Sequence, residues 1–328
     1  MVKERKHWVD ALRGVCMLAI LLYHTEMYYV GKELIDYDLY VTDALYLFFF
    51  LSGYLIYKEN GNISFSKKIK GIFRTLLIPY LIFTSIMALP KAFAHGNAVD
   101  IYSVAWDVFS GSASWFVATL IIAELLFIGS LYIVRGNIVC MFFISAVSCI
   151  GSFLIPRQAN EFCFWQMDNA LLAMGILDLG FVFHRFEKRV DTYEKYILGI
   201  APILLILIKT YVYVNGLTIS IGFLNISNNV IFAANVLVGC AFFVYLFKLM
   251  RKSIYPIEWV GSHSLVYYFL CGGVPLVIAK LFNKIGLTYN GNYLLVVMAF
   301  ITVVIVSTPI VAAIYRYIPF VVGKRKAK

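Results

Sequence analysis

The stretch that decides the fold runs from Asp10 to His24 and reads D-A-L-R-G-V-C-M-L-A-I-L-L-Y-H, within an apolar run that continues to about Val30. A run of this length predicts a membrane-spanning helix, here with an ionisable residue near each end. At about 100° per residue, the step from Arg13 to His24 returns to within about 20° of the same face, about 16.5 Å along the axis. Because burying a charged residue in hydrocarbon costs about 2.5 kcal/mol or more, both side chains should face a protein interior or a wet cavity.

The composition places the rest of the chain in a membrane as well. Of the 328 residues, 62% are hydrophobic and 14% are charged, against about 45–50% and about 25% in a typical globular protein. Recurring apolar runs predict an all-α, polytopic membrane bundle of about ten transmembrane helices. The predicted spans are 9–30, 40–57, 72–90, 115–134, 138–155, 167–185, 196–214, 230–250, 261–282 and 294–318. We expect residues 1–328 to form a single membrane domain, without a separate soluble domain.

The distribution of Lys and Arg predicts the orientation. With cytoplasmic termini, 21 of the 28 Lys and Arg residues fall in inner segments and 6 in outer segments, and Arg13 within the first helix completes the total. The positive-inside rule therefore favours cytoplasmic termini in the plasma or inner membrane. The first run lacks a small-residue cleavage site, so we expect this helix to be retained. Since the charge of +10 is spread over short loops, we expect no nucleic-acid partner.

The six cysteines predict neither a metal site nor a disulfide framework. They lie mostly inside apolar runs and include no C-x-x-C pair, so the spacing that zinc sites and disulfide-rich domains require is missing. We expect packed thiols, no metal and no tightly bound cofactor.

Several short motifs carry a family resemblance. The Arg13-to-His24 spacing, with Asp10 and Gly14 beside the Arg, resembles the R-x10-H signature of the acyltransferase-3 family of integral-membrane O-acyltransferases. Further matches follow in the family's order: Leu47–Ile56 (L-F-F-F-L-S-G-Y-L-I), Arg74 with Pro79 and Tyr80, Ser114-Trp115-Phe116, and Gly261–Leu270 (G-S-H-S-L-V-Y-Y-F-L). The resemblance runs from about residue 8 to 280. One position departs from it, because Cys271 stands where the family often has a histidine, whose role therefore cannot be transferred.

The resemblance implies an enzyme that transfers an acyl group from cytoplasmic acyl-CoA to a hydroxyl. Within the family, acetyl-CoA is the favoured donor, and a cell-surface or lipid-linked carbohydrate is the acceptor class that we expect, as in polysaccharide modification at the cell envelope. The expected partners are thus acyl-CoA, a glycan or lipid-linked saccharide, and membrane lipids. No motif identifies the acceptor, the acyl length or the oligomeric state.

The charged residues suggest how a long donor with an anionic head could bind. The expected ligands of the coenzyme's phosphates are Arg13, Arg74, Lys67, Lys68 and Lys70. Planar Arg forks suit that task, because they make charge-assisted, bidentate hydrogen bonds. His24 would be the catalytic residue, either as a general base with an ordinary pKa of about 6.5 or as a transient acyl carrier. The sequence leaves that alternative open.

Three polar residues are expected to support this site. Asp10 lies three residues before Arg13 on the same face and could orient it. Ser52 could donate a hydrogen bond to the thioester oxygen or to His24. Glu124 lies near the middle of a span, so it needs a partner or a proton, and it could orient His24.

Other features have structural explanations beside functional ones. Gly53 predicts close helix packing, and the resemblance implies that its helix packs beside the first helix. Trp115 and Phe116 could stack on a sugar, or they are the aromatic residues expected at a membrane interface. The connection 215–229 has Asn, Ser and Thr residues that suit a neutral polyol or a solvated loop, and 91–114 has the composition of an interfacial or re-entrant element.

A second class of function also fits the polar stripe of the first helix. Arg13 and His24 could line the path of a secondary transporter or of an acyl-group channel. Many secondary transporters contain repeated halves, and this sequence shows none, which favours the enzyme. Transfer of label from acetyl-CoA would distinguish the two classes.

Overall fold

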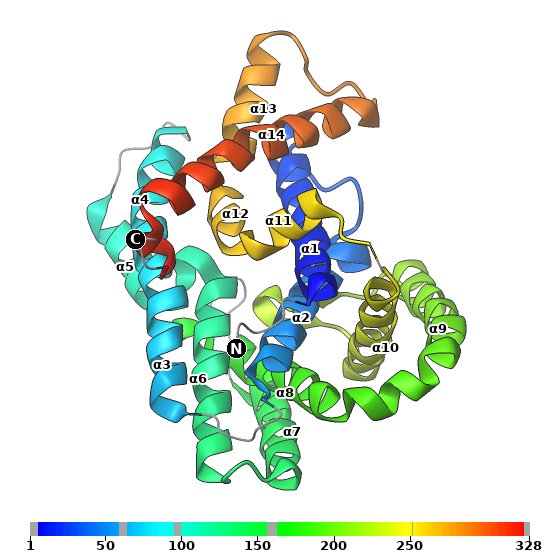
Figure 1. The fold of residues 1–328 in the computed structure, drawn as a ribbon. Coiled ribbons are helices and arrows are strands. Elements are labelled where there is room, and N and C mark those ends of the chain that lie inside the picture. The colour runs from blue at the N-terminus through cyan, green and yellow to red at the C-terminus, as the bar shows by residue number, and fades with distance from the viewer. Residues whose placement is uncertain (1–5, 59–63, 95–99, 156–162, 251, 325–328) are drawn as a thin grey trace. The chain divides into compact units, whose positions relative to one another are not determined.

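The structure is a computed structural model that describes residues 6–58, 64–94, 100–155, 163–250 and 252–324 (Figure 1). It is 83% helical, which confirms the all-α prediction. The helices are α1 (His7–Tyr29), α2 (Tyr37–Ile56), α3 (Phe65–Ile72), a π-helical turn (Phe73–Leu77), α4 (Ile78–Ala94), α5 (Ile101–Ser110), α6 (Trp115–Ile133), α7 (Ile138–Leu154), α8 (Met167–Val190), α9 (Glu194–Val214), α10 (Asn229–Lys248), α11 (Tyr255–Ser262), α12 (Ser264–Leu270), α13 (Val274–Lys284) and α14 (Tyr293–Tyr317). Two short strands, β1 (Ile219–Ser220) and β2 (Asn225–Ile226), pair antiparallel between α9 and α10.

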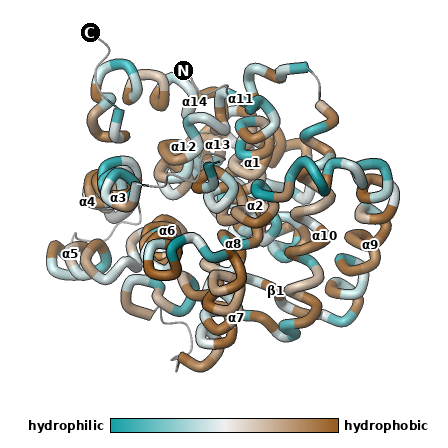
Figure 2. Tube along the Cα trace, turned by 60° about the horizontal axis from the view of Figure 1, so that its bottom comes forward, coloured by the Kyte–Doolittle hydropathy of each residue, from teal (hydrophilic) through white to brown (hydrophobic). Residues whose placement is uncertain are grey.

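Several helices are long and apolar enough to cross a membrane. The described residues contain seven such stretches, or eight if α12 and α13, which are bent by 49°, form one span. One stretch, Phe164–Val214, contains both α8 and α9, and α7 has only 17 residues. The prediction of about ten spans is therefore approximate, and the chain is a multi-pass membrane protein. Figure 2 shows the apolar residues that dominate helices such as α6, α7 and α9.

The chain divides into two compact units, each assembled from segments that are distant in sequence. Unit 1 comprises Met1–Ala44, Ile78–Val108 and Lys252–Lys328, and unit 2 comprises Leu45–Leu77 and Phe109–Arg251. The helix α2 begins in unit 1 and ends in unit 2.

In unit 1, α1 packs against α11, α12, α13 and α14. The contact with α11 is made by backbone (Figure 1). A Cβ on Gly14 would lie 2.0 Å from the carbonyl oxygen of Ile257, and one on Gly261 would lie 1.8 Å from that of Asp10. Only glycine allows the two helices to approach this closely, so these two positions fix the N-terminal half of α1 against α11.

In unit 2, α8 is the central helix and contacts both α6 and α7. It also meets α2 through a second reciprocal glycine contact. A Cβ on Gly53 would lie 1.8 Å from the Leu177 carbonyl oxygen, and one on Gly180 would lie 1.9 Å from that of Phe50. The close packing expected at Gly53 is thus confirmed, and its partner is α8.

Candidate active site

The helix α1 carries Arg13 and His24 on one unbroken segment, as the apolar run predicted. Their spacing of eleven residues therefore corresponds to about 16.5 Å along the axis. Both side chains are half-buried, whereas Asp10 is buried at 8% exposure. These three residues, which we call the Arg13–His24 stripe, thus comprise a buried acid, Asp10, and two partly accessible side chains, the Arg13 guanidinium and the titratable His24 imidazole.

The Arg13 end of the stripe contains a second acid from another helix. Asp43, on the unit 1 part of α2, is 5% exposed. Its charge and that of Arg13 both act on the buried thiol of Cys16, so the two groups lie near the same turn of α1. No role was predicted for Asp43, and its buried position near Cys16 makes it a candidate for balancing the charge of Arg13.

The His24 end of the stripe is aromatic. The imidazole lies edge-on to Tyr23 at a centroid distance of 5.4 Å and is stacked with Tyr28 at 6.3 Å, and Tyr23 in turn contacts Tyr37 at 5.0 Å. These rings restrict the directions that the imidazole can adopt, while its half-buried state leaves part of it accessible. A base or nucleophile needs both properties.

Sequence reasoning missed Glu26, which follows His24 by two residues and is completely buried. One carboxylate oxygen accepts hydrogen bonds from the amides of Leu34 at 3.0 Å and Ile35 at 3.3 Å. The other accepts from the Tyr293 hydroxyl at 2.7 Å. An acid near the end of an otherwise apolar membrane helix was the available signal, since such a residue requires partners. Glu26 fixes the connection after α1 next to the His24 end.

In unit 2, the structure brings together two residues that were assigned supporting roles separately. The hydroxyl of Ser52 on α2 donates a hydrogen bond to Oε1 of Glu124 on α6. Ser52 is buried and Glu124 is half-buried. The carboxylate therefore has a hydrogen-bond partner in the middle of its span, and the Ser52 hydroxyl is directed to an acid within its own unit.

The expected phosphate ligands of unit 2 form a group that we call the α3 basic cluster: Lys67, Lys68 and Lys70 on α3, and Arg74 in the π-helical turn. Lys68 is half-buried and the other three are exposed. The helix α3 packs on α6, where the Phe65 ring stacks on Tyr132 at 4.7 Å. Four cations within eight residues suit a polyanionic ligand, and π-helical turns occur often at functional sites.

The two aromatic residues at the start of α6 differ in their surroundings. Phe116 is 5% exposed and packs against Phe48 at 5.8 Å and Phe49 at 5.0 Å, so it belongs to the core. Trp115 is half-buried, and Gly222 of the β1–β2 connection lies against it, since a Cβ there would be 3.4 Å from the indole. Only Trp115 retains a surface on which a sugar could stack.

The polar residues between α9 and α10 mainly bind one another. The Thr218 hydroxyl donates to Oδ1 of Asn225 at 3.2 Å and shares a hydrogen bond with the Ser227 hydroxyl at 2.8 Å. Asn228 caps α10 by accepting from the Val230 amide at 3.0 Å. These bonds favour the structural explanation of this connection. The segment before α6 forms the short helix α5, in which Tyr102 and other large apolar side chains are exposed, as in interfacial helices.

The candidate residues thus fall into two groups. Asp10, Arg13 and His24 lie in unit 1, and Ser52, Glu124, Trp115, Phe116 and the α3 basic cluster lie in unit 2. Cys271 is buried at the end of α12, where its thiol donates to the Tyr267 carbonyl oxygen at 3.4 Å. Among the described residues, no group of three or more His, Cys, Asp or Glu side chains could hold a metal ion.

Comparison with known proteins identifies the family. A family model described as an acyltransferase domain matches residues 6–316, nearly the whole chain. No curated protein and no solved structure matches the chain. The match covers the Arg13–His24 stripe and the later segments that resemble the family's motifs. This multi-pass membrane protein therefore belongs to the acyltransferase-3 family and is a membrane acyltransferase.

Proposed function

We propose that this acyltransferase is an O-acetyltransferase that moves an acetyl group from cytoplasmic acetyl-CoA to a hydroxyl of a cell-surface or lipid-linked carbohydrate. The observation that carries the proposal is the stripe of α1, where the residues that carry a partly accessible imidazole and a guanidinium are separated by about 16.5 Å along the axis of one unbroken helix. A donor with an anionic head and a long arm matches that separation.

Arg13 in unit 1 would bind phosphate of the donor, and the α3 basic cluster of unit 2 is a second group of cations suited to a polyanion. Asp43 and Arg13 both act on Cys16, so the site near Arg13 contains an acid that would partly balance the guanidinium charge. The exposed members of the cluster are available to a ligand from solvent. Charge-assisted hydrogen bonds of this kind are roughly twice as strong as neutral ones, which supports cations as the main phosphate ligands.

His24 would act either as a general base or as a transient acyl carrier. As a base, the imidazole takes the proton of the acceptor hydroxyl, and the oxygen attacks the thioester carbonyl carbon. The carbon–sulfur bond then breaks, and the proton goes to the leaving CoA thiolate. As an acyl carrier, the neutral imidazole attacks the thioester carbonyl carbon, the carbon–sulfur bond breaks, and the CoA thiolate leaves with the ring proton as the thiol. The acceptor hydroxyl oxygen then attacks the acetyl carbon, the carbon–nitrogen bond breaks, and the hydroxyl proton returns to the imidazole.

The proposed orientation places both termini in the cytoplasm, in the plasma or inner membrane. The excess of Lys and Arg in the predicted inner segments supports this orientation. Arg13 would then lie near the cytoplasmic surface and His24 in the outer half of the bilayer.

The test is transfer of radiolabelled acetyl-CoA in inside-out vesicles that contain the wild type, Arg13→Ala or His24→Ala, followed by separation of glycans and lipids. We expect a labelled product with the wild type, loss of at least about 100-fold with His24→Ala, and unchanged amounts of protein. His7→Gln is the matched control, because the His7 side chain is 66% exposed. Equal labelling in all vesicles would contradict the proposal and favour a transport function.

A second measurement separates the two roles of His24. Purified protein is mixed with labelled acetyl-CoA without acceptor and is quenched rapidly. Label that stays on the wild-type protein and is absent from His24→Ala indicates an acyl-histidine. Wild-type protein that stays unlabelled without acceptor, and that forms labelled product once acceptor is added, indicates a general base.

A further inference from the structure

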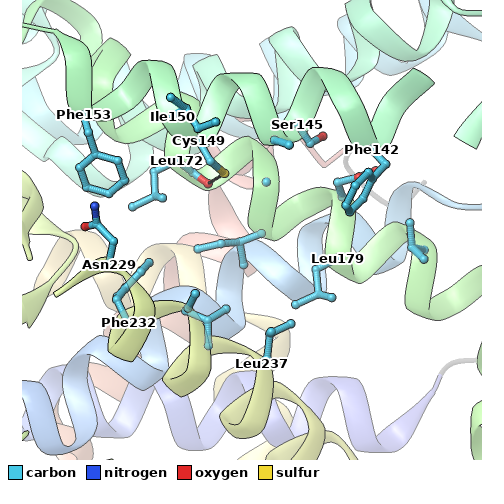
Figure 3. Close-up of a pocket in the computed structure, with 17 residues that line it drawn as sticks. Phe142, Ser145, Cys149, Ile150, Phe153, Leu172, Leu179, Asn229, Phe232 and Leu237 are labelled. Carbon is cyan, nitrogen blue, oxygen red and sulfur yellow. Dashed lines mark hydrogen bonds between the residues drawn. The ribbon is translucent and has the colours of Figure 1, made fainter. Parts of the chain in front are cut away.

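A cavity of about 560 Å³ lies in unit 2 among α7, α8 and α10 (Figure 3). None of the residues given a role in acyl transfer lines it. Its volume falls within the range of about 300–1,000 Å³ that is typical of sites for small molecules. We therefore asked which ligand its lining would accept.

The cavity is formed by helical stripes that face one another. Phe142, Cys149 and Phe153 recur at helical spacing on α7, and Phe232 and Leu237 lie across the cavity on α10 (Figure 3). All five side chains are apolar, and so is most of the remaining lining. The cavity thus has hydrocarbon on both sides.

The closed side of the cavity is set by a glycine on α8. A Cβ on Gly175 would lie 2.2 Å from Sγ of Cys149, so α7 and α8 are in close contact there. Leu237 and the α7 residues Phe142 and Ile150 are in contrast 54%, 62% and 64% exposed. Apolar side chains exposed on membrane-spanning helices face lipid, so a hydrocarbon chain can enter from that side.

Two polar side chains are buried in this apolar lining. Asp178 is 3% exposed and Ser145 is 4% exposed, and they lie beside each other. The Ser145 hydroxyl lies close enough to interact with the Asp178 carboxyl, but neither Oγ of Ser145 nor Oδ1 of Asp178 forms a hydrogen bond of normal distance and angle with any part of the described chain. An unpaired buried polar group costs about 1–3 kcal/mol, so a site with both an acceptor and a donor left open favours a ligand that supplies their partners.

We propose that this cavity binds a membrane lipid with one uncharged hydroxyl group on an apolar body. A hydroxyl can donate to Oδ1 of Asp178 and accept from Oγ of Ser145 at the same time. The hydrocarbon body lies against Phe142, Ile150 and Leu237. An anionic headgroup is excluded because it would lose its hydration in an apolar cavity whose lining contains no Lys, Arg or His side chain to pair with it. This site is independent of the acyl-transfer proposal.

The experiment uses the purified full-length protein and a diazirine derivative of hexadecanol as a photoactivatable probe. We expect the label on peptides of α7, α8 or α10. Hexadecanol should compete with the probe, whereas hexadecyl methyl ether, which cannot donate a hydrogen bond, should compete about tenfold less well. Equal competition by the ether would mean that the cavity holds a hydrocarbon chain only, and label elsewhere in the protein would also overturn the proposal.

A matched pair of serine variants tests the hydrogen bonds. Ser145→Ala should reduce labelling about tenfold. Ser148→Ala should leave labelling unchanged, because the Ser148 hydroxyl lies on the same helix but contacts Sδ of Met174 and does not line the cavity. Asp178→Leu should abolish competition by the alcohol, and if that variant does not fold, the serine pair decides. Equal labelling of both serine variants would overturn the proposal.

Discussion

The two ends of α1 are fixed by different kinds of contact. In the N-terminal half, backbone meets backbone at Gly14 and Gly261, and Nδ1 of His7 hydrogen-bonds Oε2 of Glu258 at 2.8 Å. At the C-terminal end, the contacts are made by side chains. Glu26 binds three donors, and the Tyr29 hydroxyl donates to the Leu287 carbonyl oxygen at 2.6 Å.

This difference shows how a helix can be held firmly and still offer an accessible group. The glycine contact tolerates no added atom, so it determines the position of the Arg13 end. The hydrogen bonds of Glu26 and Tyr29 fix the other end from faces that His24 does not need. The imidazole therefore remains half-buried on a helix that is fixed on both sides of it.

The largest expected effect comes from breaking the glycine contact. Gly261→Ala places a Cβ 1.8 Å from a backbone oxygen, where no side chain can move aside, so we expect a loss of stability of more than about 3 kcal/mol. The matched control is Gly272→Ala, whose Cβ would lie 4.0 Å from the Tyr28 hydroxyl oxygen. Thermal unfolding of the purified proteins in detergent measures the difference, and similar midpoints for the two variants would refute the contact.

Removing the hydrogen bonds of Glu26, at the C-terminal end of α1, should have a smaller effect on stability. Glu26→Ala leaves two amides and one hydroxyl without their acceptor, which should cost about 2–3 kcal/mol. Glu33→Ala, an exposed acid in the same connection, should change stability by less than about 0.5 kcal/mol. The same unfolding assay applies. If Glu26→Ala instead lowered activity at full stability, Glu26 would belong to the catalytic chemistry.

A substitution that keeps the charge of Arg13 tests how this residue binds the donor. Arg13→Lys loses the planar fork, so we expect about tenfold weaker use of acetyl-CoA, seen as a higher KM, with unchanged unfolding. Arg189→Lys, at an exposed position, serves as the control. Full activity of Arg13→Lys at low acetyl-CoA would argue against bidentate phosphate binding.

The smallest effect concerns pH. Burial alone would raise the pKa of Glu258, but hydrogen bonds from His7, Ser253 and the Ile254 amide lower it below its ordinary value of 4.5. Glu258 therefore stabilises the fold above about pH 4.5, and this contribution is lost as the pH falls through the lowered pKa. Unfolding midpoints measured from about pH 6 to about pH 3 should fall less steeply for Glu258→Gln than for the wild type. Parallel curves would show that the pair contributes nothing.

The sequence was sufficient for features that depend on local geometry. The common face of Arg13 and His24 follows from helical periodicity alone, and the apolar runs located the helices because hydrocarbon requires them. Close packing at Gly53 was predictable, but its partner α8 was not. The number of spans could be predicted only approximately. The helix α7 is short, and α8 and α9 lie in one continuous stretch, and both features depend on where individual helices begin and end.

Long-range partners could not be predicted. Ser52 and Glu124 are 72 residues apart, and Glu26 and Tyr293 are 267 apart. No local pattern pairs such residues, since the fold alone decides which buried acid meets which donor. The distinction between Phe116 in the core and the half-buried Trp115 likewise depends on α2 and on the β1–β2 connection.

The late origin of the residues that fix α1 has a consequence for biosynthesis. Gly261, Leu287 and Tyr293 all come from the last quarter of the chain, so α1 enters the membrane long before they are made. Until then, Glu26 can accept only from the amides of Leu34 and Ile35, and the turn of α1 that carries Asp10 lacks its contact with Gly261. Ribosomal stalling or truncation before α11 would leave an intramembrane charged helix exposed. Such a nascent chain would hold ionisable side chains in hydrocarbon without the contacts that the finished fold supplies.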